Sequence, residues 1–104
     1  MVSWCVMCRR NTESVRHLFD ECPVTRQIHV QVAIRMHMAV RPRHRRDIFK
    51  GRGSTKERAV TLITQFVVWR ERCNRIFRDS DKPDEILVDE IEEQWQYSTR
   101  AEAR

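Results

Sequence analysis

Glycine and proline are scarce in this chain, and long apolar runs are missing. With 2 glycines and 3 prolines among 104 residues, it contains neither a glycine-rich phosphate loop nor a Gly-x-Ser-x-Gly turn. It also lacks a pair of acidic residues in an apolar setting. Since no set of residues suggests catalysis, we expect a protein that is not an enzyme and has no small-molecule substrate.

The chain also lacks the apolar segments that membranes and secretion require. No run of about 18 apolar residues occurs, which argues against a membrane span. The opening Met-Val-Ser-Trp-Cys-Val-Met-Cys does not resemble a secretory signal. We expect a nuclear or cytoplasmic protein with no membrane partner. Its 104 residues are 34% charged and 40% hydrophobic, which predicts one small domain with a thin core.

The net charge of +5 hides two segments of opposite sign. Residues 35–58 carry nine Lys or Arg against two acids, for a charge of +7, whereas residues 79–93 carry eight acids against one Lys, for −7. The two segments can neutralise each other, within one chain or between two chains, or each can bind an outside partner.

Three of the four cysteines cluster with a histidine in the pattern Cys5-x2-Cys8-x8-His17-x4-Cys22. Three thiolates and one imidazole at compact spacing are typical of a closed, structural Zn²⁺ site with no open position for a catalytic water. The alternative is that Cys5 and Cys8 are a redox pair or idle thiols. We interpret Cys73 as a buried core thiol.

Three other histidines, His29, His37 and His44, could form a second metal site. The first two are eight residues apart, which is not the spacing of a helical chelate, and no carboxylate motif accompanies them. We therefore interpret all three as solvated or partly packed imidazoles.

The periodicity predicts a mainly α fold. A small zinc knuckle, made of a short β-hairpin plus a helix, is followed by a helix that starts at Pro23 and ends near Val40. Residues 56–78 and 84–98 then form an αα-hairpin, with Ser54 as a predicted N-cap. The predicted divisions are the knuckle and its helix (1–40), a basic linker (41–55) and the αα-hairpin (56–104), together one small domain.

The inner face of the αα-hairpin is predicted from its apolar residues. Phe66, Trp69, Phe77 and Trp95 are expected between the two helices. On the first of these helices the predicted inward stripe comprises Ala59, Leu62, Ile63, Phe66, Val67, Arg70 by its stem, Cys73, Ile76 and Phe77. Because two helices leave part of this surface open, either the helix after Pro23 or a second copy of the chain must cover it.

Two segments resemble a known family. Residues 5–28 are similar to the zinc-binding domain at the C-terminal end of plant non-LTR (LINE-type) reverse transcriptases. Residues 62–77 are similar to that family's Trp-Lys-Glu-Arg-Asn helix, and residues 91–95 to the helix that follows. The matching knuckle residues are Cys5, Cys8, Glu13, His17, Leu18, Phe19, Cys22 and Pro23.

The chain departs from the family pattern at His29, where Trp is usual, and at Cys73, where Asn is common. None of the acidic catalytic motifs of reverse transcriptase or nuclease is present. The resemblance therefore implies a stand-alone, retroelement-derived plant protein that holds Zn²⁺ and acts by binding.

Two kinds of partner remain open. The first is nucleic acid, RNA or single-stranded DNA, bound with low sequence specificity through basic residues that neutralise phosphates. The candidates are Arg41, Arg43, Arg45, Arg46, Lys50 and Arg52. The same residues can instead be a solvated loop or a nuclear-targeting run.

The second kind of partner is a protein, either another protein or a second copy of the chain, in a toxin, an antidote or a regulator. Zinc would then be purely structural, and apolar side chains of the αα-hairpin would bind the partner. The candidates are Leu62, Phe66, Trp69, Phe77, Leu87 and Trp95, which otherwise are ordinary core residues.

Overall fold

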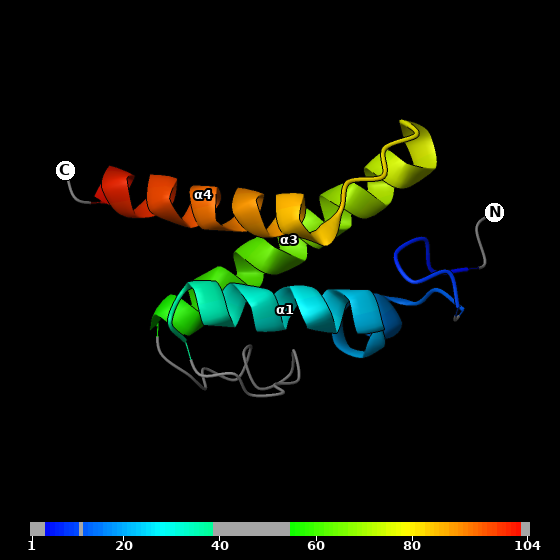
Figure 1. The fold of residues 1–104 in the computed structure, drawn as a ribbon, viewed down its shortest axis with the longest axis horizontal. Helices are drawn as coiled ribbons and strands as arrows, with labels where there is room; N and C mark the ends of the chain where they lie inside the picture. The colour runs from blue at the N-terminus through cyan, green and yellow to red at the C-terminus, as the bar shows by residue number, and fades with distance from the viewer. Residues whose placement is uncertain (1–3, 11, 39–54, 103–104) are drawn as a thin grey trace.

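The structure is a computed structural model that describes residues 4–10, 12–38 and 55–102. It is mainly helical, as predicted (Figure 1). A π-helical turn, η1 (His17–Glu21), precedes α1 (Pro23–Arg35), and α3 (Thr55–Phe77) precedes α4 (Asp84–Glu102). No helix in the described part of the chain is long and apolar enough to span a membrane.

Helix α1 begins where the sequence predicts and ends earlier than predicted. Pro23 occupies the first helical turn, where its missing N–H costs nothing. The last turn closes with bonds from the Met38 N–H to the Ala33 carbonyl (2.8 Å) and from the His37 N–H to the Ile34 carbonyl (3.3 Å). His37 has φ of 55°, so this is a Schellman ending with a left-handed residue. The helix therefore stops at Arg35 and does not reach Val40.

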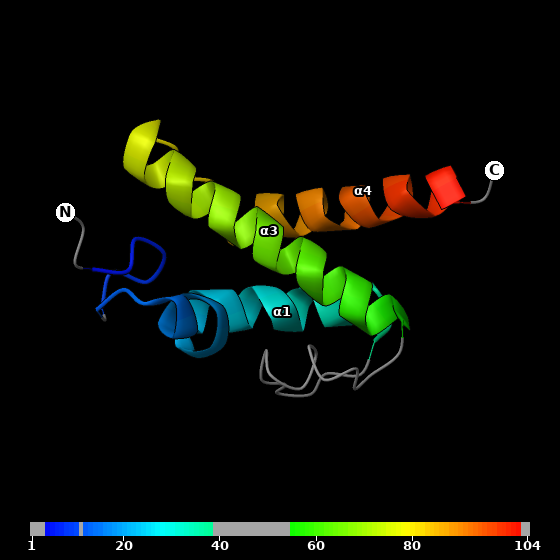
Figure 2. The ribbon, with the colours of Figure 1, turned by 180° about the vertical axis from the view of Figure 1, so that it is seen from behind.

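Helices α3 and α4 lie within a few residues of their predicted bounds. Asp84 and Glu85 in the first turn of α4 suit its positive end. Helix α3 crosses both α1 and α4, and α1 and α4 run in the same direction (Figure 1). From behind, α3 is the nearest element, with α1 and α4 on its far side (Figure 2). The helix after Pro23, α1, packs against both α3 and α4, as one of the two predicted covers would.

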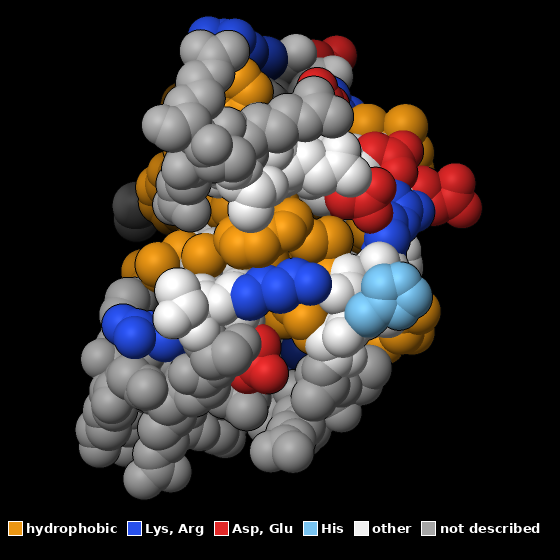
Figure 3. Space-filling model, turned by 90° about the vertical axis from the view of Figure 1, so that its left-hand side faces the viewer, with side chains coloured by type: hydrophobic (Ala, Val, Ile, Leu, Met, Phe, Trp, Pro, Cys, Tyr) orange, Lys and Arg blue, Asp and Glu red, His pale blue; other side chains and the backbone are white. Residues whose placement is uncertain are grey.

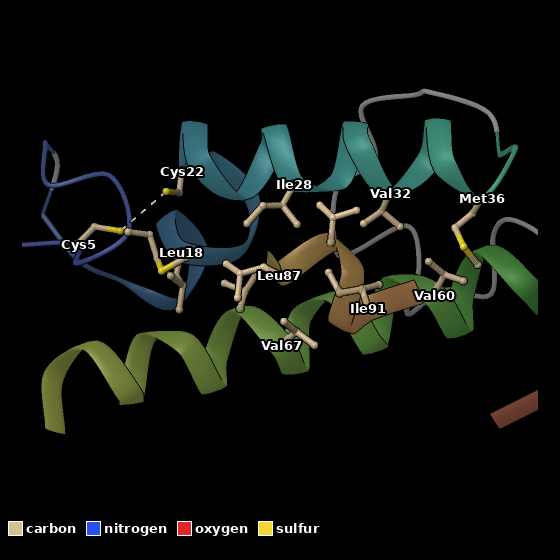
Figure 4. Close-up of a cluster of buried hydrophobic side chains, with 13 residues drawn as sticks. Cys5, Leu18, Cys22, Ile28, Val32, Met36, Val60, Val67, Leu87 and Ile91 are labelled. Atoms are coloured by element: carbon tan, nitrogen blue, oxygen red, sulfur yellow. Dashed lines mark hydrogen bonds between the residues drawn. The ribbon is translucent and has the colours of Figure 1, made fainter. Parts of the chain in front are cut away.

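The core fills the space between these three helices. Ile28 and Val32 of α1 meet Val67 of α3 and Leu87 and Ile91 of α4, all with at most 3% exposure (Figure 4). Cys5, Leu18 and Cys22 continue the same cluster into the knuckle. At the end of the molecule where α1 and α4 finish, hydrophobic side chains still reach the surface between charged ones (Figure 3).

The knuckle does not form the predicted β-hairpin within the described residues. Trp4 and Thr12 make one isolated antiparallel bridge. Residues between them form a tight turn in which the Arg9 N–H bonds to the Cys5 carbonyl (2.8 Å) and Arg9 has φ of 59°. The chain curls to bring Cys8 back beside Cys5, which leaves too little extended backbone for a ladder.

The predicted inward stripe of α3 is largely wrong. The buried residues are Val60, Thr64, Val67, Val68 and Glu71, of which the prediction contained only Val67, and the predicted Ile63 packs partly buried against the core. Phe66, Trp69 and Phe77, expected between the helices, are 57%, 44% and 78% exposed, whereas Trp95 packs partly buried against the core. At 100° per residue, the side that faces α1 and α4 is about 130° around the helix from the predicted one.

Part of the charge asymmetry is neutralised within the chain. Arg35 of α1 bonds to Asp89 and lies 3.8 Å from Glu92, both on α4. Arg70 of α3 lies 3.0 Å from Glu90, which Lys82 also contacts at 2.7 Å. The acidic segment thus binds cations of this chain along the side of α4.

Candidate metal centre

Four side chains from three local elements converge at the knuckle. Cys5 and Cys8 lie on the N-terminal turn, His17 begins η1 and Cys22 directly precedes α1. Their sulfur and ring nitrogen atoms all lie within 4.8 Å of one another. In the part of the chain that the structure describes, this is the one group of His, Cys, Asp or Glu that could hold a metal ion. The sequence predicted this set in full.

The spacing of the ligand atoms fits a small tetrahedral cation. A tetrahedron with metal–sulfur bonds of about 2.3 Å and metal–nitrogen bonds of about 2.0 Å separates two sulfurs by about 3.8 Å and a sulfur from a nitrogen by about 3.5 Å. The Cys5 and Cys22 Sγ atoms are 3.8 Å apart (Figure 4). Cys8 Sγ lies 3.4 Å from His17 Nε2. All four cysteines are free thiols, and a disulfide would need sulfurs about 2.05 Å apart.

Most of the site is buried from solvent. Cys5 and Cys22 are fully buried and His17 is 4% exposed, while Cys8 is half-buried. Burial raises the pKa of the Cys5 thiol to about 11, against an opposing effect of hydrogen bonds from the Cys8 and Met7 backbone. Buried thiolates need a counter-charge, and a divalent cation at the centre of the cluster supplies it.

Local backbone bonds hold each ligand in place. Ser14 Oγ accepts a hydrogen bond from the His17 N–H (2.9 Å), as an N-cap side chain does. The Cys22 N–H bonds to the His17 carbonyl (2.6 Å), and its own carbonyl accepts the first bond of α1 from the Arg26 N–H (2.9 Å). Cys22 is the N-cap of α1 without using its side chain, so its sulfur can face the cluster.

Two arginines of α3, Arg72 and Arg75, attach the knuckle to the helices, and the sequence analysis identified neither of them. Arg72 forms a bidentate pair with Glu13, with Nη2 to Oε2 at 3.1 Å. Arg75 Nη1 donates to the Val6 carbonyl in the Cys5–Cys8 turn at 3.2 Å. Arg75 also bonds to the buried Glu71, four residues earlier on the same helix. That spacing was a visible signal, because it placed an acid and a base on one helix face.

The predicted nucleic-acid residues at 41, 43, 45, 46, 50 and 52, and His44, lie outside the described residues. Of the predicted protein-binding residues, Leu62, Phe66, Trp69 and Phe77 are exposed. Leu87 is fully buried between α1, α3 and α4, and Trp95 packs partly buried against the same core, so these two side chains fit the alternative interpretation as core residues.

His29 and His37 take no part in the cluster. His29 is half-buried on α1, and burial lowers the pKa of its imidazole, against an opposing attraction from Asp20. His37 is exposed at the end of α1. Among the described residues, the group that could hold a metal ion includes neither of them.

No protein-family model matches the chain, and neither the curated proteins nor the solved structures include a significant match.

Proposed function

We propose that the chain is a non-catalytic zinc module in which Cys5, Cys8, His17 and Cys22 hold one Zn²⁺. The observation that carries this is that the four ligand atoms lie within 4.8 Å of one another, with the Cys5–Cys22 and Cys8–His17 separations matching the S···S and S···N edges of a zinc tetrahedron. Three thiolates and one imidazole would fill all four positions, so the ion's role is structural. When bound, it supplies the charge that keeps the buried thiols deprotonated.

The zinc's task would be to close the knuckle and fix it to α1 and α3. Cys22 leads directly into α1, and the Cys5–Cys8 turn contacts Arg75 of α3. A short segment of 4–22 has too few buried apolar residues to fold alone, and structural zinc contributes about 10–16 kcal/mol of apparent binding free energy in comparable small modules.

Native mass spectrometry of the purified chain tests the zinc proposal. We expect one zinc per chain, lost in Cys22→Ser and retained in the matched control Cys73→Ser, whose thiol lies outside the cluster. Retention of zinc by Cys22→Ser, or a folded wild-type protein that takes up no zinc, would contradict the proposal.

We further propose that the module derives from a LINE-type retroelement and binds single-stranded nucleic acid. The two segments that carry the family resemblance contact each other through Glu13 and Arg72, which supports their being one functional unit. The basic run 41–52 carries the charge. Trp4 is 60% exposed, and its indole is an aromatic surface on which one base could stack.

Titration of labelled single-stranded RNA and DNA at 50 and 200 mM salt, roughly, tests this second step. Binding should weaken by at least about tenfold at the higher salt, because several phosphates exchange counterions for arginines. Arg43→Gln/Arg45→Gln/Arg46→Gln should abolish it, whereas Arg26→Gln, on the exposed side of α1, should not. Binding that ignores both salt and the triple substitution would refute the nucleic-acid function but not the zinc site.

A further inference from the structure

Helix α3 is apolar on two opposite sides. Its inner side, against α1 and α4, carries the buried residues of the core. At 100° per residue, a second stripe lies opposite this side at spacings of four and three. We call it the outer stripe, and it consists of Leu62, Phe66, Trp69, Cys73 and Phe77.

The outer stripe is exposed although it is the more apolar of the two sides. The inner side includes Thr64 and the buried carboxylate of Glu71, whereas the outer stripe has two phenylalanines and a tryptophan. Leu62, Phe66, Trp69 and Phe77 are 48%, 57%, 44% and 78% exposed. Helices with apolar residues on all sides are normally buried, so this side is built for a partner. Neither α1 nor α4 covers α3 on this side (Figure 2).

The partner that fits is a second copy of α3 in antiparallel orientation. The stripe is close to symmetric about a point between Trp69 and Arg70. Turned end for end, it places Leu62 opposite the partner copy's Phe77 and Phe66 opposite the partner copy's Cys73. The two Trp69 side chains meet near the centre. A two-fold interface requires this self-complementarity, which a stripe shaped for an unrelated protein need not have.

Charges at the two ends of α3 favour the same orientation. The exposed Lys56 and Arg58 lie at its start, and the exposed carboxylates of Asp79 and Asp81 follow its end. In an antiparallel pair the basic start of each α3, with Arg58, lies beside the turn that follows the partner copy's Phe77, where the exposed Asp79 stands. A parallel pair would instead set Arg58 against Arg58.

The borders of the stripe are suited to an interface rim. The Arg70 guanidinium lies over the Phe66 ring at 5.4 Å and the Arg72 guanidinium over the Trp69 ring at 4.7 Å. Arg70 and Arg72 point to opposite borders of the stripe. Arginine and aromatic side chains together are typical of interface centres with a polar rim.

We propose that two copies of this chain associate through the outer stripe of α3 in an antiparallel, two-fold pair. This goes beyond the proposed zinc and nucleic-acid function, since the stripe contains none of the residues assigned to either. The dimer would therefore contain two knuckles and two basic segments.

Sedimentation of the zinc-loaded full-length chain over a concentration series tests the proposal. We expect a dimer at tens of micromolar. Leu62→Glu/Phe66→Glu should raise the dimer dissociation constant by about 100-fold or more, because it would bury four unpaired carboxylates in one interface. The matched control Ile34→Glu replaces an equally exposed apolar residue of α1 and should leave the dimer intact. Helical circular dichroism and zinc content must match the wild type in both variants.

Crosslinking tests the orientation of the pair, and sedimentation tests the interface. A photo-crosslinker at position 62 should attach near Phe77 of the other copy, and attachment near its Leu62 would overturn the antiparallel arrangement. A monomer at 100 µM, roughly, or a dimer that survives the double substitution, would overturn the interface itself. If Leu62→Glu/Phe66→Glu loses helicity, Phe77→Asp at the end of the stripe serves in its place, since that side chain is 78% exposed.

Discussion

Glu71 is a fully buried carboxylate that organises the junction between the two long helices. Its oxygens accept hydrogen bonds from Arg75 Nε (2.8 Å), the Lys82 N–H (3.0 Å) and Ser80 Oγ (3.3 Å). Arg75 in turn donates to the Lys82 carbonyl at 3.0 Å and to Val6 of the knuckle. One ion pair therefore holds the end of α3, the turn into α4 and the metal-binding turn together.

Glu71→Gln should lower the free energy of unfolding by about 2–4 kcal/mol, because it leaves the largely buried Arg75 with only the exposed Asp81, 3.4 Å away, as a counter-charge. Glu93→Gln, on the exposed side of α4, should change it by less than about 0.5 kcal/mol. Urea denaturation of the zinc-loaded proteins measures both values. Equal losses of unfolding free energy in the two variants would mean that the buried ion pair stabilises the fold no more than a surface charge does.

The pair of Glu13 and Arg72 should be coupled far more strongly than a surface pair. The Glu13 and Arg72 side chains are 13% and 20% exposed, and the hydrogen bonds that Arg72 donates to the Glu13 carboxylate raise the pKa of the Arg72 guanidinium. A double-mutant cycle with Glu13→Gln and Arg72→Gln should give a coupling energy of about 1–3 kcal/mol. The same cycle on Arg9 and Asp81, which are 3.8 Å apart and mostly exposed, should give a value near zero. Similar coupling in both cycles would contradict this reading of the contact.

His29 should make the fold sensitive to mild acid. Burial lowers its pKa in the folded state below the usual value, so the unfolded chain binds the proton more readily. The stabilising effect of a neutral His29 is complete above pH 6.5, roughly the pKa of an unperturbed imidazole, and is lost as pH falls towards the lower folded value.

Melting temperatures at pH 7.5 and 6.0 check this. When the pH falls to the lower value, the melting temperature of His29→Gln should decrease by less than that of the wild type. His37→Asn, at an exposed position with a left-handed backbone, should show the same decrease as the wild type. Because acid also weakens zinc binding, only the difference between variants at equal zinc content is informative. An unchanged pH response in His29→Gln would exclude His29 as the source.

At the scale of the elements, the sequence predicted the helices well and their orientation poorly. Pro23 and the acids at Asp84 and Glu85 marked helix starts through local chemistry that tertiary packing does not alter. The rotation of α3 could not be predicted in the same way, because its sequence has apolar residues on both sides and periodicity selects the stronger stripe. The inner side was not recognised in the sequence, because it includes the polar residues Thr64 and Glu71. In the structure their polar groups bond to the Val60 carbonyl and to Arg75.

Two substitutions to alanine on opposite sides of α3 test that rotation. Val68→Ala removes a fully buried side chain from the inner side and should cost about 1.5–3 kcal/mol, whereas Leu62→Ala, at a site 48% exposed, should cost less than about 1 kcal/mol in the monomer. Denaturation at a concentration too low for self-association compares them directly. A larger cost for Leu62→Ala would restore the inward stripe that the sequence predicted.

At the scale of the whole molecule, the sequence predicted the metal ligands but not how the knuckle joins the helices. Cysteine and histidine spacing within 18 residues identifies a ligand set, because few other roles require those residue types together. Glu13 and Arg72 are 59 positions apart, and no local pattern pairs them. The same holds for Arg75 and Val6, whose contact depends on the path of the chain between them.

This junction predicts that zinc stabilises the helices as well as the knuckle. Chelation should lower the melting temperature of the helical signal by roughly 10 °C or more, because the knuckle then releases its contacts with α3. Hydrogen exchange should show lost protection in α3 around Arg72 and Arg75.

The effect of chelation should depend on the bridge between Glu13 and Arg72. Glu13→Gln/Arg72→Gln removes both charges, so neither is left buried without a partner. In this variant the chelator should reduce the protection of α3 from hydrogen exchange by less than it does in the wild type. The matched control Arg35→Gln/Asp89→Asn cuts a bridge between α1 and α4, away from the knuckle, and should keep the full response. If chelation of the wild type increases hydrogen exchange in residues 4–22 but not in α3, the proposed coupling is wrong, and the helices fold independently of the knuckle.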